Sequence, residues 1–314
     1  MKTMTLGTSH LVSTRLAYGC WRLAGTMDPG AVKPASEKRG IQAVLAAYEA
    51  GYTLFDHADI YCQGVAESLF GRALKEARGM RERILVATKC GIRFAGEPTQ
   101  GAPFRYDFSA DHILRSCEGS LKRMGIEVID LYQLHRPDWL MRPEEVAEAF
   151  CCLRRSGKVR EFGVSNFLPS QVDALQSACA FPLVVNQVEI SLARLDCFQD
   201  GTLDQCLERR ITPLAWSPLA GGVLGTGCKV DAKHPRRTRL NALVKAMDQV
   251  AKARGTNRTV VALSWLMKHP SGILPIIGTT DPQRIREAVT ADDIELSREE
   301  WYQLLEAARG ERLP

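Results

Sequence analysis

Eight short apolar segments alternate with longer amphipathic segments, and this alternation constrains the fold more than any other feature. The apolar segments have the length of strands, and the segments between them have the period of helices that bury one face. We predict strands at residues 17–21, 53–56, 84–89, 130–135, 160–165, 184–187, 212–216 and 273–277. We predict helices at residues 37–50, 65–77, 109–124, 143–156, 169–178, 201–209, 240–254, 259–269 and 282–289.

A strand–helix unit repeated eight times is typical of a parallel barrel. A doubly wound open sheet usually carries G-x-G-x-x-G after its first strand, and no such motif follows AYGCW at residues 17–21. The 314 residues suit one barrel of ordinary size. We therefore predict one α/β domain over residues 1–314, a (β/α)8 TIM barrel whose bottom is capped by an N-terminal β-hairpin in MTLGTSHLVSTRL.

The composition narrows the class of protein. A net charge of +5 is smaller than the basic excess that nucleic-acid binders usually concentrate on one face. No segment reaches the roughly 18 apolar residues of a membrane helix, and the N-terminus has no signal-peptide pattern. The ten cysteines show no CxxC pair and no zinc spacing, which indicates reduced thiols and no metal site. We expect a cytoplasmic protein without nucleic-acid or membrane partners, and the pattern predicts no particular oligomeric state.

Polar side chains stand at or just after the ends of the predicted strands, which all meet at one mouth of a barrel. Taken singly, each could be a helix cap, a snorkelling surface residue or ordinary packing. Their gathering at one end favours a functional site, because barrel enzymes build their sites there. Two long loops, 91–108 and 217–239, would lie on the same rim. The residues are Asp56, Lys89, His135, Ser165, Asn166, Gln187, Trp216 and Ser217.

Tyr61 follows Asp56 closely enough to fold back over this mouth. A free phenol has a pKa of about 10. An ammonium about 4 Å away, at an effective dielectric near 20, contributes about 4 kcal/mol. That energy corresponds to a pKa lowered by up to about 3 units. We therefore predict that Lys89, held by Asp56, makes Tyr61 a usable proton donor while His135 orients a substrate oxygen.

The motifs that carry these residues resemble those of the aldo-keto reductases, which are NAD(P)H-dependent barrel enzymes. The stretches around the tyrosine, the lysine and the histidine are GYTLFDHADIYC, ILVATKCG and DLYQLHRPD. Further matches follow in family order, so the resemblance covers nearly the whole chain. They are FGVSNF, VNQVEIS, AWSPLAGG and PIIGTTDPQRI.

The resemblance implies reduction of an aldehyde or ketone to an alcohol, with Tyr61 as general acid, Lys89 and Asp56 tuning it, and His135 placing the carbonyl. It also implies a set of cofactor contacts. These are Ser165, Asn166 and Gln187 at the nicotinamide carboxamide, Trp216 on its ring, Ser217, Leu219 and Gly221 along the pyrophosphate and ribose, and Gly278, Thr279 and Arg284 at the adenosine phosphate.

Three positions depart from the family pattern. Cys62 replaces a common glycine, Gly278-Thr279 replaces a common Lys-Ser, and Ala288 replaces a common asparagine. The last two bear on cofactor preference. Because Arg284 remains and its planar fork can bind phosphate, we expect NADP(H), with NAD(H) less favoured.

Smaller signals on the rim each have two interpretations. Trp21 and Trp139 are expected to line the pocket of a small carbonyl substrate, although ordinary packing would also explain them. Cys62 and Cys90 would be reactive if the lysine ammonium lowered the pKa of their thiols, and packing is the alternative. The basic run at residues 233–239 either attracts an anionic dinucleotide or is a solvated loop.

Two other functions stay open. A Schiff-base lyase would use Lys89 as its nucleophile, which requires a neutral lysine, whereas Asp56 favours the ammonium. An NADPH-binding regulatory subunit with little turnover would use the same cofactor site for a partner protein. The complete set of four catalytic residues argues for retained chemistry.

Overall fold

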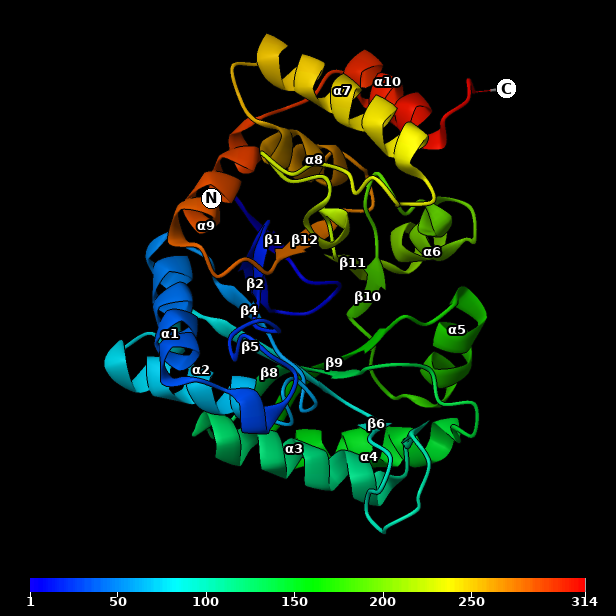
Figure 1. Ribbon diagram of the computed structural model, residues 1–314. Coiled ribbons are helices and arrows are strands. Elements are labelled where there is room, and N and C mark those ends of the chain that lie inside the picture. The colour runs from blue at the N-terminus through cyan, green and yellow to red at the C-terminus, as the bar shows by residue number, and fades with distance from the viewer. Residues whose placement is uncertain (314) are drawn as a thin grey trace.

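The computed structural model describes residues 1–313 and contains a closed barrel of eight parallel strands (Figure 1). The barrel closes where the last strand pairs with the first, Ile276 opposite Ala17. The predicted barrel is confirmed, with strand ends that differ by one or two residues. The strands are β3 (Ala17–Gly19), β4 (Leu54–Asp56), β5 (Leu85–Cys90), β8 (Ile129–Leu134), β9 (Val159–Ser165), β10 (Val185–Glu189), β11 (Thr212–Trp216) and β12 (Leu274–Ile277).

Helices surround the barrel (Figure 1), and each predicted helix is present. The α10 helix was not predicted, although Ser297 and Glu300 form a capping box at its start and Gly310 ends it. It packs against α7, and Trp301 stacks on Trp265 with ring centroids 4.8 Å apart. The helices are α1 (Pro34–Glu49), α2 (Val65–Glu76), α3 (Ala110–Met124), α4 (Pro143–Arg155), α5 (Pro169–Ala178), α6 (Thr202–Arg209), α7 (Arg237–Ala253), α8 (Arg258–Met267), α9 (Pro282–Val289) and α10 (Arg298–Arg309).

An N-terminal hairpin closes the bottom of the barrel, as predicted. Its strands β1 (Thr3–Thr5) and β2 (Val12–Thr14) pair antiparallel. Gly7, at the tip, donates from its backbone nitrogen to Thr212 Oγ1 at 2.8 Å, at the start of β11. A Cβ at Gly7 would lie 2.6 Å from the Val184 carbonyl oxygen, so the close approach requires glycine.

Side chains alternate between the two faces of each strand, and this alternation explains why polar groups gather at the mouth of the barrel, opposite the hairpin. Leu54 on β4 belongs to the apolar layer at the barrel floor, Phe55 packs outward, and Asp56 comes back to the interior at the mouth. On β5, Ala87 lies in the floor layer and Lys89 stands two residues further on, fully buried. The apolar positions therefore fix the register that points the polar ones inward.

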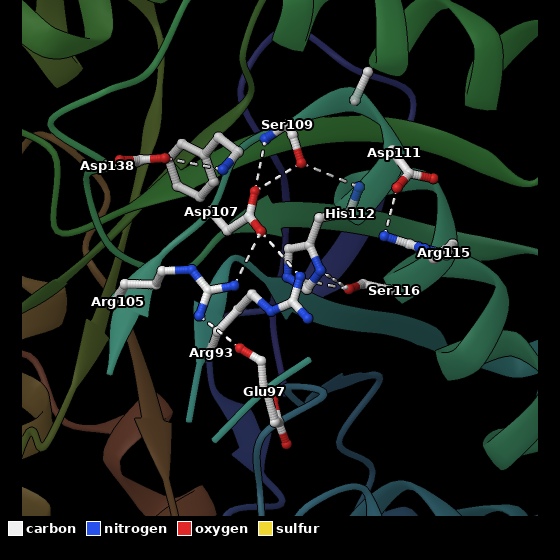
Figure 2. Close-up of polar contacts among 12 residues, drawn as sticks. Arg93, Glu97, Arg105, Asp107, Ser109, Asp111, His112, Arg115, Ser116 and Asp138 are labelled. Carbon is white, nitrogen blue, oxygen red and sulfur yellow. Dashed lines mark hydrogen bonds and ion pairs between the residues drawn. The ribbon is translucent and has the colours of Figure 1, made fainter. Parts of the chain in front are cut away.

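The loop after β5 contains a short hairpin where only an irregular loop was predicted. Its strands are β6 (Ile92–Arg93) and β7 (Arg105–Tyr106). Asp107 holds this hairpin in place (Figure 2). Its Oδ2 pairs with Arg93 Nη1 at 3.0 Å, and its Oδ1 accepts a hydrogen bond from Ser109 Oγ at 2.7 Å. Asp138 accepts from the Phe108 backbone nitrogen at 2.9 Å. The hairpin is thus fixed to the start of α3 and to the loop after β8.

All ten cysteines are free thiols. Among residues 1–313, none of the helices combines the length and the apolar character needed to cross a membrane. The span of one domain over residues 1–314 stays a prediction, and its last residue lies outside the described range.

Candidate active site

An ion pair inside the barrel forms the base of the site. Lys89 is 0% exposed, and its Nζ donates to both carboxylate oxygens of Asp56 at 2.7 and 2.8 Å and to the His57 carbonyl oxygen at 2.6 Å. These acceptors match the three hydrogens of an ammonium. Gln187 Nε2 also donates to Asp56 Oδ1, at 2.8 Å. Burial lowers the pKa of Lys89, and the Asp56 carboxylate opposes that shift.

Tyr61 is carried by a tight turn between β4 and α2. The next two residues, Cys62 and Gln63, are left-handed with φ of 48° and 51°, and Gly64 follows with φ of 88°. A left-handed conformation costs about 1–2 kcal/mol for a residue with a Cβ. The turn brings the Tyr61 ring to 5.3 Å from Lys89 Nζ and to 6.0 Å from the His135 ring, centroid to centroid. The structure thus brings the predicted catalytic side chains together.

The electrostatics of Tyr61 differ from the prediction. Burial raises the pKa of Tyr61 well above its ordinary value, the Asp56 charge adds to the rise, and Arg136 opposes it. The predicted lowering is wrong because burial disfavours the charged form of the phenol, and the nearby Asp56 carboxylate disfavours it further. Tyr61 therefore keeps its proton at neutral pH, as a proton donor must.

His135 closes the other side of the mouth. It is 8% exposed, its backbone nitrogen donates to the Cys90 carbonyl oxygen at 2.9 Å, and its Nδ1 has no hydrogen-bond partner within residues 1–313. Burial lowers the pKa of His135 well below its ordinary value, and the charges of Lys89 and Arg136 add to this. The imidazole is therefore neutral at pH 7 and able to donate one hydrogen bond.

Arg136 was not predicted as a site residue. Its guanidinium carbon lies 5.4 Å from the centroid of the Trp216 ring, and it makes no ion pair within the described chain. Its position directly after His135 was the available signal. It adds a positive charge at the mouth.

The residues assigned to the carboxamide form one hydrogen-bonded group. Ser165 Oγ donates to the Gln187 carbonyl oxygen at 2.8 Å, and Asn166 Nδ2 donates to Ser165 Oγ at 2.8 Å and to the His135 carbonyl oxygen at 3.2 Å. Trp216 Nε1 donates to Asn166 Oδ1 at 3.0 Å. These side chains come from neighbouring strands, as predicted from the strand ends.

The loop after β11 presents open backbone to the mouth. Ser217, which begins it, and Gly221 have φ of 51° and 68°. A Cβ at Gly221 or Gly222 would meet nothing within 4 Å. Leu219 lies between them and is partly buried against the core. Backbone of this kind can approach a ligand closely.

The segment after β12 carries the predicted phosphate contacts. Gly278 lies beside Gly19, and the Thr279 carbonyl oxygen accepts from Tyr18 Oη at 3.0 Å. Arg284 is 61% exposed, and its Nε lies 3.8 Å from Asp281 Oδ2. Its charge is therefore partly matched within the protein.

A cavity of about 370 Å³ adjoins this segment and was not predicted. Two arginines line it, Arg22 from the loop after β3 and Arg39 from α1, and neither makes an ion pair within residues 1–313. Thr280, at the end of the segment after β12, lines the same cavity. The other lining residues are Trp21, Leu23, Gly25, Thr26 and Met27.

The smaller predictions have mixed outcomes. Trp21 lines this cavity and is 47% exposed, whereas Trp139 is 91% exposed, which does not support a place in a pocket wall. Cys62 and Cys90 are both 0% exposed, and burial raises the pKa of both thiols, which supports the packing interpretation over reactive thiols. The basic run at 233–239 lies before α7 and in its first turn.

The Aldo/keto reductase family model matches residues 15–309. The chain therefore belongs to the aldo-keto reductase family and is an oxidoreductase of a family that generally uses NAD(P)H. It is 43% identical to the 6-dehydroglucose reductase of Novosphingobium aromaticivorans, over 98% of this chain and 96% of that protein.

Two further relatives agree with this family. Oxidoreductase YdhF of Escherichia coli is 39% identical, over 96% of this chain and 95% of that protein. The solved structure of a glycerol dehydrogenase from Gluconobacter oxydans superposes with a TM-score of 0.85 at 26% identity, over 99% of this chain and 97% of that one. The predicted resemblance and the predicted barrel are confirmed.

Proposed function

We propose that this protein reduces an aldehyde or ketone to an alcohol with NADP(H), and that Tyr61 donates the proton. The observation that carries the proposal is the convergence of four side chains at the mouth. Lys89 and Asp56 form a buried pair beneath the Tyr61 ring, and the His135 ring faces that ring edge-on. The arrangement supplies a protonated phenol, a neutral imidazole and a buried ammonium within one site.

Each group has a distinct role in the proposed reaction. A bound nicotinamide supplies hydride chemistry. His135 donates a hydrogen bond to the carbonyl oxygen and orients it. Tyr61 passes its phenol proton to that oxygen as negative charge develops. The Lys89 ammonium, 5.3 Å from the Tyr61 ring centroid, stabilises the phenolate that remains.

The described residues fit a nicotinamide dinucleotide. The amide and hydroxyl groups of Ser165, Asn166 and Gln187 suit a carboxamide, which both donates and accepts. The open backbone at Gly221 leaves room for a pyrophosphate. Arg136 lies over the Trp216 ring, so a nicotinamide stacked on this tryptophan would use the other face or displace the guanidinium.

The preference for NADP(H) rests on charge near the adenosine end. The extra phosphate needs cationic partners, and a charge-assisted contact contributes roughly 1.5–3 kcal/mol, or about 10- to 100-fold in affinity. Arg284 is partly matched by Asp281, so Arg39, on the cavity beside Thr280, is a second source of positive charge. Arg284→Ala should weaken NADPH binding and leave NADH binding nearly unchanged. Equal losses for both cofactors would contradict this assignment.

For the substrate, we propose a carbonyl-bearing sugar. The support is the likeness to 6-dehydroglucose reductase over nearly the whole chain. The experiment is a screen of 6-dehydroglucose, simple aldehydes, ketones and quinones, in which the loss of NADPH absorbance measures turnover. Turnover of dehydro-sugars above the simple aldehydes supports the assignment, and turnover of none of these carbonyls contradicts the proposed function.

The alternative functions are less well supported by the geometry. A Schiff-base nucleophile must be neutral and reachable, whereas Lys89 is 0% exposed and makes three hydrogen bonds. Borohydride trapping with a carbonyl substrate tests that alternative. A regulatory subunit would bind NADPH without turnover in the carbonyl screen. We further propose that the protein resides in the cytoplasm, which its ten free cysteines support.

A further inference from the structure

Glu67 is a buried acid that lies behind the turn of the proton donor. It stands in the first turn of α2 and is 0% exposed. Its Oε1 accepts from Thr88 Oγ1 at 2.7 Å, and its Oε2 accepts from Arg123 Nε at 2.6 Å. Thr88 directly precedes Lys89 on β5, and Arg123 belongs to α3. One carboxylate therefore connects three elements on the outside of the barrel wall.

The arginine of this pair lies against the turn that follows Tyr61. A Cβ at Gly64 would lie 2.5 Å from Arg123 Cδ and 2.7 Å from its Nε. Gly64 also has φ of 88° and follows the two left-handed residues Cys62 and Gln63. Backbone conformations of this kind persist only where the surroundings hold them.

The turn is also tied directly to the strand that carries Lys89. The Asp59 backbone nitrogen donates to the Lys89 carbonyl oxygen at 3.1 Å, and the Tyr61 carbonyl oxygen accepts from Gly64 and Ala66 at 3.2 and 3.3 Å. The turn thus has contacts with the Glu67–Arg123 pair on one side and with β5 on the other. Neither Glu67 nor Arg123 belongs to the four catalytic side chains.

We propose that Glu67 and Arg123 are positioning residues for the proton donor: the pair fixes the left-handed turn of Tyr61 against the strand of Lys89. A buried carboxylate is unfavourable unless it is paired and hydrogen-bonded, and replacing a buried ion pair by apolar residues of similar volume is often neutral or stabilising. Fixing the geometry of the turn after Tyr61 would explain why a buried ion pair stands at this position. This inference rests on the proposed function of Tyr61.

The test is Glu67→Gln, which retains an acceptor for Thr88 and removes the charge that binds Arg123. We expect kcat to fall about 10- to 100-fold, the scale of a misplacement of about 1 Å. KM and the Kd of NADPH, from fluorescence titration, should stay within about 3-fold, because ground-state binding is untouched. The solvent deuterium isotope effect on kcat should increase, since proton transfer becomes slower. Glu67→Gln/Arg123→Met should be no slower than the worse single variant.

A second ion pair of α2 provides the control. Arg72 and Glu37 lie 2.9 Å apart on the surface, and Arg72→Met or Glu37→Gln should leave kcat and the isotope effect unchanged. A folded Glu67→Gln enzyme with wild-type kcat and isotope effect would overturn the inference. If Glu67→Gln does not fold, Arg123→Lys is measured in the same way with the same decision. Full activity of Tyr61→Phe, or an inactive wild type, would instead contradict the proposed function.

Discussion

Replacement of Lys89 by methionine should strongly destabilise the fold, because it leaves the Asp56 carboxylate buried without its cation. Asp56 is 3% exposed and would retain the hydrogen bond from Gln187 Nε2 at 2.8 Å. At 2.7 Å and an effective dielectric near 20, the attraction lost is about 6 kcal/mol. Measured costs of breaking one side of a buried pair are about 3–5 kcal/mol, which is a large share of the usual stability of about 5–15 kcal/mol.

Removing both charges should be far milder. In Asp56→Asn/Lys89→Met no uncompensated charge remains, so we expect a loss of about 0–2 kcal/mol, well below the sum of the single variants. Equilibrium urea unfolding at pH 7 measures the four free energies. Lys268→Met is the control, because its partner Glu295, 2.9 Å away, is 85% exposed, and exposed pairs contribute about 0–1 kcal/mol.

The double-mutant cycle formed by these four free energies can refute this account of the Asp56–Lys89 pair. If Lys89→Met costs no more than Lys268→Met, then Asp56 is not an unpaired buried anion in the variant. If the two single effects simply add, the pair is not coupled. In either case the Lys89 ammonium would not be held in place by Asp56, and the electrostatic part of the proposed mechanism would fail.

Three further predictions follow from named groups. Arg39→Ala should weaken NADPH binding about 10-fold, the scale of a charge-assisted contact, and spare NADH; an equal effect of the exposed neighbour variant Lys38→Ala would contradict a specific contact. Thiol alkylation under native conditions should leave Cys62 and Cys90 unmodified in mass spectrometry, because both are 0% exposed; labelling of either cysteine as fast as an exposed thiol would contradict its burial. Burial raises the pKa of Asp59 to about 8, so the folded state binds more protons than the unfolded state below that pH. As the pH rises, stability should therefore fall between about pH 4, the pKa of an unfolded aspartate, and about pH 8, by at most about 1.4 kcal/mol per pH unit. Asp59→Asn should remove this fall in urea unfolding.

The barrel and its site residues were predictable because a period of two converts apolar positions into a register. Once Leu54 and Ala87 are assigned to the interior, Asp56 and Lys89 must point the same way two residues later. Closure of the barrel then brings together, at its mouth, residues that are far apart in the chain. The α10 helix also has a signal in the sequence, since Ser297 and Glu300 form a capping box and Gly310 ends the helix.

Other features depend on three-dimensional pairing and left no readable signal. The rise in the pKa of Tyr61 depends on how deeply the fold buries the phenol beside the Asp56 carboxylate. In the sequence, Glu67 is an acid in the first turn of a helix, where acids are common, and only the packing of α3 against α2 reveals its burial. The exposure of Trp139 depends on the path of the loop after β8, and a rim position alone could not predict it.

The central claim is that this chain reduces carbonyls with Tyr61 as the proton donor, and turnover of Tyr61→Phe tests it most directly. The variant removes one hydroxyl and retains the ring between Lys89 and His135. We predict a fall in kcat of about 100-fold or more, the usual scale for loss of a general acid. NADPH affinity in the same preparation should stay within a few-fold, which shows that the cofactor site is intact. Wild-type turnover by Tyr61→Phe would contradict the claim.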